Sequence, residues 1–467
     1  MSPDEFRKNG REVIDWIADY YEQLESFPVL SQVSPGEIRA GLPAEPPAQG
    51  QGFDGLLADL DRVIMPGITH WQHPSFFGYF PASATGPAIL GDLLASGLGV
   101  QGMLWATSPA ATELETQMLD WLATLLELPA AFRSDAAGGG VIQHSASDAA
   151  LVALLAALHR ASGGITETAG VSSARYTAYT SGQTHSSVEK ACRIAGIGSQ
   201  ALRKLDVDPI TLAARPEHLA ALLAADVAAG YTPALVVASV GATGTGAIDP
   251  VGELGRLARE YRAWLHVDAA WAGVAAVCPE LRWINAGIES ADSYCTNPHK
   301  WLLTNFDCST FWVADRSALI GALSILPEYL RNSATESGEV FDYRDWQVPL
   351  GRRFRALKLW TVLRWYGADG LRSHIRAHVE LAQEFASWVA ADPRFELLAP
   401  HPLALVTFAL ADDEATRRLL AAVNSSGEAY LTHTIVNGRY AIRLAIGAVR
   451  TERRHVEAVW HSLTSRL

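Results

Sequence analysis

Between about residues 83 and 354, short apolar runs alternate with longer windows rich in Ala and Leu. The runs have the length and β-branched composition of buried strands, and the windows have the periodicity of helices. Strands that alternate with helices predict a mostly parallel sheet covered on both faces. Strands are expected at 176–180, 234–239, 264–267, 293–296 and 309–313, and helices at 111–126, 147–160, 186–195, 216–229 and 251–261.

The N-terminal segment has a different pattern. Apolar residues recur at three- and four-residue spacings from Phe6 to Tyr21, which predicts an amphipathic helix. A second helix is expected over 53–65. A helical segment this small buries little surface by itself, so we expect it to pack on a partner.

The segment after about residue 357 again begins with helices and ends with strand-like pieces. Helices are expected at 357–366 and 374–391, and strands at 403–408 and 440–446. This order predicts a small α+β domain. The predicted organisation is an N-terminal helical dimerisation segment (1–82), a large α/β domain that binds the cofactor (83–356) and a small C-terminal α+β domain (357–467).

Composition narrows the possible functions. Of 467 residues, 49% are hydrophobic and 19% are charged, which excludes a disordered chain. The net charge of −13 disfavours a nucleic-acid binder. The N-terminus does not resemble a signal peptide, and the apolar runs are far shorter than the roughly 20 residues of a membrane helix. Four cysteines without paired spacing predict neither a metal site nor a disulfide framework, so we expect a reduced, cytoplasmic protein with no membrane segment and no metal ion.

Two charged residues follow neighbouring predicted strands. Asp268 comes directly after the strand at 264–267, and Lys300 follows the strand at 293–296. Ligands of open α/β sheets bind beyond the carboxyl ends of the strands, so both side chains are expected in one crevice. One explanation is a structural ion pair. The other is a site for pyridoxal phosphate, which needs a lysine to form a Schiff base and an acid to keep its ring nitrogen protonated.

Two further motifs agree with the cofactor explanation, although each has a simpler one. The stretch 138–148 contains a Gly-rich segment, a short strand, and then Ser145 and Ser147 at the start of a helix. Hydroxyl and backbone N–H groups there suit a phosphate, but serine before a helix is also a common cap. His185 begins another helix, where its ring can stack on a flat cofactor or simply pack against the protein. Patterns of serine hydrolases, P-loops and dinucleotide sites do not occur around these residues.

Six stretches together resemble a known family. They are 66–71, 77–81, 108–115, 266–273, 297–302 and 349–355. Over nearly its whole length, the chain resembles the pyridoxal-phosphate-dependent aromatic-L-amino-acid decarboxylases, the group II decarboxylases. The resemblance implies an aspartate-aminotransferase-like α/β fold (fold type I), with a mostly parallel central sheet, an N-terminal helical arm and a C-terminal α+β cap. It also implies pyridoxal 5′-phosphate as the cofactor.

The resemblance implies roles for individual residues. Lys300 would carry the Schiff base, Asp268 would pair with the ring nitrogen, and Ala270 would pack on the ring. His185 would stack on the ring beside the substrate carboxylate, and Tyr329 of a mobile loop would protonate the substrate carbon. The remaining cofactor contacts would come from Ser145, Ala146, Ser147, Thr243, Asn297 and His299.

The implied activity is decarboxylation of an aromatic L-amino acid, similar to tryptophan, phenylalanine or tyrosine, to the arylalkylamine and CO₂. One alternative is an aldehyde synthase, in which the loop Tyr is commonly Phe or the stacking His is Asn. Tyr329 and His185 are both retained here, which favours simple decarboxylation. A second alternative is a catalytically silent cofactor-binding protein. The resemblance further implies a homodimer in which the loop reaches the neighbouring subunit's site.

Aromatic walls are expected around the substrate, which disfavours glutamate. Three positions depart from or vary within the family. His144 adds bulk beside the phosphate turn, Met103 stands where relatives often have Phe, and Gly351 accompanies indole substrates in plant relatives, which favours tryptophan-like substrates. The expected substrate residues are Trp71, Tyr79, Phe80, Pro81, Met103, His185, Leu350 and Gly351.

Overall fold

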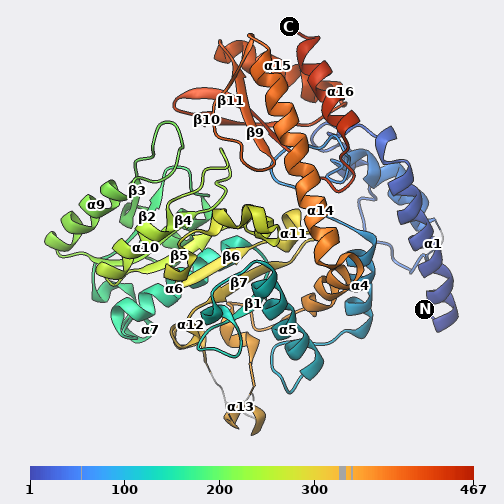
Figure 1. Cartoon of the computed structure of the whole chain (residues 1–467). Helices are drawn as coiled ribbons and strands as arrows, with labels where there is room; N and C mark the ends of the chain where they lie inside the picture. Colours follow the sequence, from blue (N-terminus) through green and yellow to red (C-terminus); the bar gives the residue numbers. More distant parts are fainter. Residues whose placement is uncertain (54, 326–332, 338–339) are drawn as a thin grey trace.

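The computed structural model describes all residues except 54, 326–332 and 338–339. Its centre is a seven-stranded sheet in the order β1-β7-β6-β5-β4-β2-β3 (Figure 1). Strand β7 is antiparallel to both of its neighbours, and every other pair is parallel, so the expected mostly parallel sheet is confirmed. The strands are β1 (Gly139–Gln143), β2 (Tyr176–Ser181), β3 (Leu202–Leu205), β4 (Thr232–Ser239), β5 (Trp264–Asp268), β6 (Ser293–Thr296) and β7 (Ser309–Val313).

Helices cover both faces of this sheet, and alternate strand residues pack in two different clusters. In β4, Val237 packs with helices α6 (Ala146–Ser162), α8 (Ser187–Ile194) and α12 (Arg316–Leu323). Its neighbour Val236 belongs to the cluster on the other face. That face is covered by α5 (Pro109–Leu125), α9 (Pro216–Ala228) and α10 (Val251–Glu260). Burial on both faces explains why the central strands read as continuous apolar runs.

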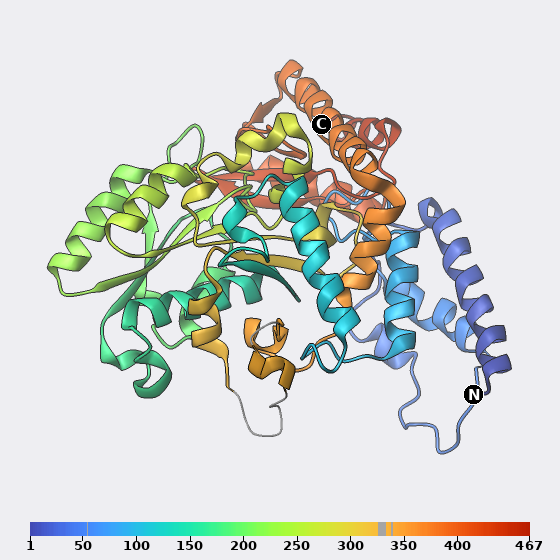
Figure 2. The same cartoon turned by 60° about the horizontal axis from the view of Figure 1, so that its bottom comes forward.

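The C-terminal part forms a second, antiparallel sheet in the order β10-β11-β9-β8. Helix α14 (Arg355–Ala391) runs from α4 (Gly86–Leu98) toward this sheet (Figures 1 and 2). It spans both helices expected there, with one interruption at Gly367, whose φ is 61° and ψ 178°. The other elements are β8 (Phe395–Leu397), β9 (Leu405–Leu410), α15 (Asp413–Ser426), β10 (Thr432–Val436), β11 (Arg439–Ala445) and α16 (Arg453–Thr464).

The N-terminal helix α1 (Pro3–Glu22) begins with a capping box between Ser2 and Glu5, and none of its residues is buried. The helix expected over 53–65 is wrong in extent, because Gly55 adopts a left-handed φ of 77° and the α-helix starts only after it. Short α- and π-helical turns occur between the longer elements. They are α2 (Glu37–Ala40), α3 (Leu56–Asp59), a π-helical turn (Leu60–Ile64), α7 (Thr166–Ala169), α11 (Pro298–Trp301) and α13 (Ser333–Ser337).

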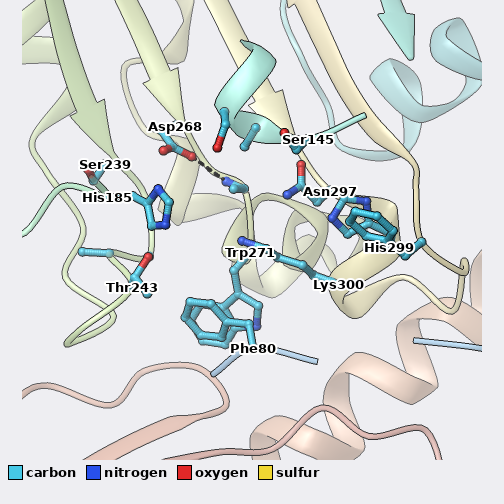
Figure 3. Close-up of a pocket in the computed structure, with 16 residues that line it drawn as sticks. Phe80, Ser145, His185, Ser239, Thr243, Asp268, Trp271, Asn297, His299 and Lys300 are labelled. Atoms are coloured by element: carbon cyan, nitrogen blue, oxygen red, sulfur yellow. Dashed lines mark hydrogen bonds between the residues drawn. The ribbon is translucent and has the colours of Figure 1, made fainter. Parts of the chain in front are cut away.

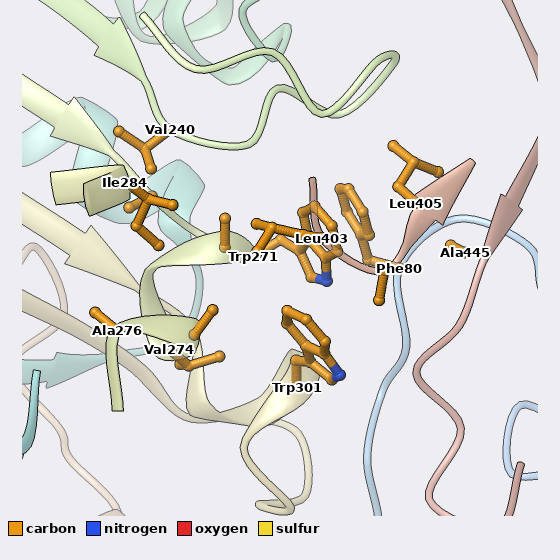
Figure 4. Close-up of a cluster of buried hydrophobic side chains, with 14 of the residues drawn as sticks. Phe80, Val240, Trp271, Val274, Ala276, Ile284, Trp301, Leu403, Leu405 and Ala445 are labelled. Carbon is orange, nitrogen blue, oxygen red and sulfur yellow. The ribbon is translucent and has the colours of Figure 1, made fainter. Parts of the chain in front are cut away.

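One apolar cluster joins the two sheets. Phe80, Trp271 and Trp301 lie between loops of the large sheet and Leu405 and Ala445 of the small one (Figure 4). The division into segments 1–82, 83–356 and 357–467 stays a prediction; its second boundary falls just inside α14. Among the described residues, no helix is long and apolar enough to cross a membrane.

Candidate active site

A cavity of about 250 Å³ lies at the carboxyl ends of the central strands (Figure 3). Asp268 is the last residue of β5, and Lys300 lies in α11, directly after β6. Ser239 ends β4 and also lines the cavity. The crevice expected beyond the strand ends therefore exists, and it collects side chains from three adjacent strands.

Asp268 and Lys300 face this cavity without neutralising one another. The Lys300 ammonium makes no ion pair among the described residues, and its Nζ lies 5.5 Å from the centroid of the Phe80 ring. Burial lowers the pKa of Lys300, the Asp268 carboxylate opposes this shift, and Arg443 adds to it. A simple structural ion pair is thus not what these residues form. A lysine with a lowered pKa suits attack on a carbonyl.

One end of the cavity is built from hydrogen-bond donors. Ser145 is the N-cap residue of α6, so the free N–H groups of the first helical turn lie beside the Ser145 and Ser147 hydroxyls. The Asn297 Oδ1 accepts the Ser309 hydroxyl at 2.6 Å, which leaves the Asn297 amide N–H groups for the cavity. This end suits an anion.

His299 adds a further donor at the same end. Its Nδ1 accepts the backbone N–H of Cys308 at 2.9 Å, and burial lowers the pKa of His299 to about 3. The imidazole is therefore neutral, with its proton on Nε2. That nitrogen is left free to donate to a ligand oxygen.

His185 lies at the mouth of the cavity, where its side chain is exposed. Its Nδ1 accepts the Ser187 backbone N–H at 3.2 Å, so the remaining proton of the neutral ring is on Nε2. Loss of water around the ring lowers the pKa of His185, Asp268 opposes the shift, and Lys300 reinforces it. His185 therefore offers a flat neutral ring and one N–H donor.

The opposite wall is aromatic. Phe80 stacks on Trp271 at 4.3 Å between centroids, and Trp271 stacks on Trp301 at 5.2 Å. The Arg443 guanidinium lies 5.3 Å from the Phe80 centroid and donates to the carbonyls of Tyr79 and Gly244. Its hydrogen bonds hold the wall in place, while burial lowers the pKa of Arg443 to about 10.

The structure brings all predicted cofactor residues together. The residues that line the cavity include Ser145, Ala146, Ser147, His185, Thr243, Asp268, Ala270, Asn297, His299 and Lys300.

The predicted substrate residues are more dispersed. Phe80 and His185 line the cavity, whereas Trp71 and Tyr79 stack on one another at 5.5 Å on an exposed surface. Pro81, Met103, Leu350 and Gly351 are also outside the lining of the cavity. Tyr329 lies outside the described residues. These substrate roles stay predictions.

His144 is not part of the cavity lining. Its Nδ1 lies 3.5 Å from a carboxylate oxygen of Asp148, in the first turn of α6. His144 directly precedes Ser145, and its role beside the phosphate turn stays a prediction.

Sequence reasoning did not select several residues that line the cavity. Ser239 ends the strand predicted at 234–239, and Gly241 and Ala242 follow it, so their position at a strand end was a usable signal. Trp271 belongs to a family-like stretch. Phe306 had no local signal, because a loop places its ring 4.8 Å from His299.

Comparison with known protein families identifies a match. Residues 35–411 match the family described as "Pyridoxal-dependent decarboxylase conserved domain". The chain belongs to this decarboxylase family. Its cofactor is pyridoxal phosphate, and the chain is an enzyme that depends on it.

Several relatives match the chain over almost their full length. Tryptophan decarboxylase 2 of Oryza sativa subsp. japonica is 46% identical, with 99% of this chain and 94% of the relative covered. Phenylacetaldehyde synthase of Arabidopsis thaliana is 48% identical, with 98% and 95% covered. The crystal structure of Oryza sativa TDC with PLP and tryptamine superimposes with a TM-score of 0.96 at 42% identity, covering 100% of this chain and 98% of that one.

The donor set of the cavity fits pyridoxal phosphate. The cofactor has an aldehyde, a basic ring nitrogen and a phosphate, and the cavity offers the Lys300 amine, a carboxylate and a cluster of hydroxyl and N–H donors. Lys300 would hold the aldehyde, Asp268 the ring nitrogen, and the donors around Ser147 and His299 the phosphate. Among the described residues, no group of three or more His, Cys, Asp or Glu side chains could hold a metal ion.

Proposed function

We propose that this enzyme decarboxylates aromatic L-amino acids to arylalkylamines and CO₂. The observation that carries the proposal is the stacked wall of Phe80 and Trp271 facing the Lys300 amine in one cavity. An aromatic wall favours a flat apolar side chain. The Arg443 guanidinium beside the wall already donates to two backbone carbonyls and to the Thr432 hydroxyl, so it is not free to select an acidic side chain.

Each residue has a defined task in this proposal. When bound, pyridoxal phosphate supplies the electron sink for the breaking bond between Cα and the carboxylate. Lys300 would attach the cofactor through Nζ, and its lowered pKa favours the neutral, nucleophilic amine. Asp268 would hold a proton at the cofactor's ring nitrogen. His185 would pack against the ring and direct its Nε2–H toward the substrate carboxylate, which would orient the bond to be broken.

Two residues support decarboxylation over oxidative formation of an aldehyde. His185 lies at the cavity with its neutral ring, and Tyr329 is retained in the loop where the family resemblance assigns it. Tyr329 would give its phenolic proton to the substrate carbon, which yields an amine. The aldehyde synthase stays the second candidate, because a phenylacetaldehyde synthase is among the relatives at 48% identity.

Replacement of Tyr329 by Phe tests this assignment. Without the phenolic proton, we expect Tyr329→Phe to form less amine and to release aldehyde, ammonia and peroxide with uptake of oxygen. Tyr231→Phe is the matched control. Tyr231 directly precedes β4 and therefore lies at the amino end of this strand, whereas the cavity lies at the carboxyl ends of the strands. An unchanged product from Tyr329→Phe would show that the assignment is wrong.

The activity itself is tested by a substrate screen. Trp, Tyr, Phe, their hydroxylated forms and Glu are incubated with the enzyme, and amine and CO₂ are measured. We expect amines from the aromatic substrates only. Gly351 and the tryptophan decarboxylase relative support a preference for tryptophan-like substrates. Release of CO₂ from none of them would favour a catalytically silent cofactor-binding protein, and faster turnover of Glu would refute the aromatic specificity.

We further propose that the active form is a homodimer. Helix α1 buries none of its residues, although it carries an apolar stripe. Helix α4 beside it exposes four leucines, Leu90, Leu93, Leu94 and Leu98. Exposed apolar surface of this extent is typical of an interface.

A further inference from the structure

A row of buried polar side chains lies beneath Asp268. In β5, Trp264, His266 and Asp268 are two residues apart, so they point to the same face of the sheet. In β6, Ser293 pairs with His266 and Cys295 pairs with Asp268 in the parallel register. The side chains of Trp264, Ser293, His266 and Cys295 are all buried, with at most 1% of their surface exposed.

The hydrogen bonds along this row have one direction. The Trp264 indole can only donate, and its Nε1 donates to the Ser293 hydroxyl oxygen at 2.7 Å. The Ser293 oxygen lies 2.9 Å from the His266 Nδ1. If that nitrogen also donated, the buried hydroxyl proton would lack an acceptor among the described residues, which is costly. The Ser293 hydroxyl therefore donates to His266.

The direction continues through His266 to Asp268. Burial lowers the pKa of His266 to about 4, so the ring is neutral and carries its proton on Nε2. That nitrogen lies 3.8 Å from the Cys295 sulfur. Burial, reinforced by Asp268, raises the pKa of Cys295 well above its usual range, so the thiol keeps its proton. The Cys295 sulfur lies 3.7 Å from the Asp268 Oδ1, to which it donates.

The row thus ends on one oxygen of a carboxylate. Asp268 Oδ1 also accepts the Ala270 backbone N–H at 3.1 Å. The other oxygen, Oδ2, has no hydrogen-bond partner among the described residues and is the one left for the cofactor. The two donors on Oδ1 fix the orientation of the carboxylate, because rotation of the carboxylate would break both contacts. The charged groups that face Asp268 from across the cavity are Lys300 and, when protonated, His185.

We infer that Cys295, supported by His266, Ser293 and Trp264, is a positioning residue that fixes the orientation of the Asp268 carboxylate and directs its Oδ2 to the cofactor ring. The inference rests on the proposed role of Asp268 at the ring nitrogen. Cys295 touches neither substrate nor cofactor and acts only through Asp268.

Three cysteine variants test the inference. Cys295→Ala removes the donor, Cys295→Ser keeps a donor, and Cys192→Ala is the matched control, since Cys192 is equally buried in the same apolar cluster but does not line the cavity. The dissociation constant of pyridoxal phosphate is measured by equilibrium dialysis, and the melting temperature is measured without cofactor. We expect Cys295→Ala to bind the cofactor roughly fivefold more weakly, as for loss of one ordinary hydrogen bond, because the thiol is a weak donor. Cys295→Ser should restore the affinity, and Cys192→Ala should leave it unchanged even where it melts earlier.

A spectroscopic measurement tests the hydrogen bond directly in the cofactor-free protein. The S–H stretching band that Cys295→Ala removes belongs to Cys295. In Asp268→Ala this band should move to higher frequency, because the thiol loses its acceptor; an unmoved band overturns the inference.

The measured cofactor affinities distinguish failure of the proposed role of Asp268 from failure of the inference on Cys295. If Asp268→Asn leaves the cofactor affinity unchanged, the role of Asp268 is wrong and the inference fails with it. If Asp268→Asn weakens binding while Cys295→Ala does not, only the inference on Cys295 is overturned.

Discussion

At the scale of single residues, the surroundings of Lys300 disfavour a positive charge. Its amine faces the Phe80 ring, lacks an ion-pair partner among the described residues, and has a pKa lowered by burial. The balance is set by two neighbours of opposite charge, because Asp268 raises this pKa and Arg443 lowers it. The amine is therefore held ready for bond formation at a lower pH than a surface lysine would allow.

Loss of this amine should abolish both colour and turnover. We expect Lys300→Ala to lose the visible absorbance of the attached cofactor and more than about a thousandfold in kcat, as when a covalent catalyst is removed. Absorbance spectra and amine formation measure the two effects. Lys190→Ala, on the exposed side of α8, is the control and should change neither. A yellow, active Lys300→Ala protein would contradict the assignment.

That the predicted cofactor residues meet in one cavity is understandable from the sequence, because each lies within a few residues of a strand end. Asp268 and Lys300, for example, follow two adjacent strands that are readable as apolar runs. The aromatic wall could be read only in part. Phe80 and Arg443 come from segments far from either strand in the chain, and only the tertiary packing brings them to within 5.3 Å of one another.

At the scale of elements, the long helix α14 depends on one unusual backbone position. Gly367 has φ 61° and ψ 178°, a conformation that is essentially limited to glycine, and a Cβ there would meet no other atom within 4 Å. The interruption is therefore a matter of backbone conformation and not of crowding.

Substitution of Gly367 measures the cost of placing a side chain on this backbone conformation. We expect Gly367→Ala to lower the free energy of unfolding by about 1–3 kcal/mol. Gly10→Ala, within the regular helix α1 and equally free of neighbours, should instead raise it by about 0.5–1 kcal/mol. Urea denaturation of both variants measures the difference, and equal midpoints would argue against strain at Gly367.

The strands that sequence analysis missed share a position. Strands β3, β8 and β10 are each at the edge of their sheet, and β10 alternates between exposed and less exposed residues. Edge strands need no continuous apolar run, because one side and often one face meets water. The central strands β4, β5, β6 and β7 are buried on both faces, and all four were predicted to within two residues.

At the scale of the whole molecule, buried histidines couple stability to pH. Burial lowers the pKa of His266 and His374 to about 4 and that of His299 to about 3. In the unfolded chain these groups titrate near pH 6.5, so the unfolded state binds more protons as the pH falls. Burial raises the pKa of Asp249 to about 6, so this carboxylate takes up a proton in the folded state first and offsets the effect of about one histidine on the pH dependence.

The stability should therefore be full above about pH 6.5 and decrease toward pH 4, by up to about 1.4 kcal/mol per pH unit for each histidine. Urea midpoints of the cofactor-free protein at several pH values measure this slope. His374→Gln should flatten it, whereas His461→Gln on the outer end of α16 should not. A midpoint that stays constant between pH 7 and pH 5 would contradict the expectation.

The proposed dimer makes a prediction at the same scale. Leu94 and Leu98 on α4 are 57% and 61% exposed in the single chain, and each would be worth roughly 2 kcal/mol when buried by a partner. We expect Leu94→Lys with Leu98→Lys to give monomers in sedimentation velocity and to lower activity. Ile210→Lys, at another exposed apolar residue, should leave the dimer intact. An unchanged sedimentation coefficient for the double variant would place the interface elsewhere.

The stacked indoles of Trp271 and Trp301 also give the protein an optical property. Trp271 lines the cavity and stacks on Trp301, so a molecule bound in the cavity is close enough to accept excitation energy from either ring. A bound chromophore that absorbs where indoles emit will receive that energy and quench their fluorescence. The wall that shapes the pocket therefore also reports, without any label, how much of the enzyme is loaded.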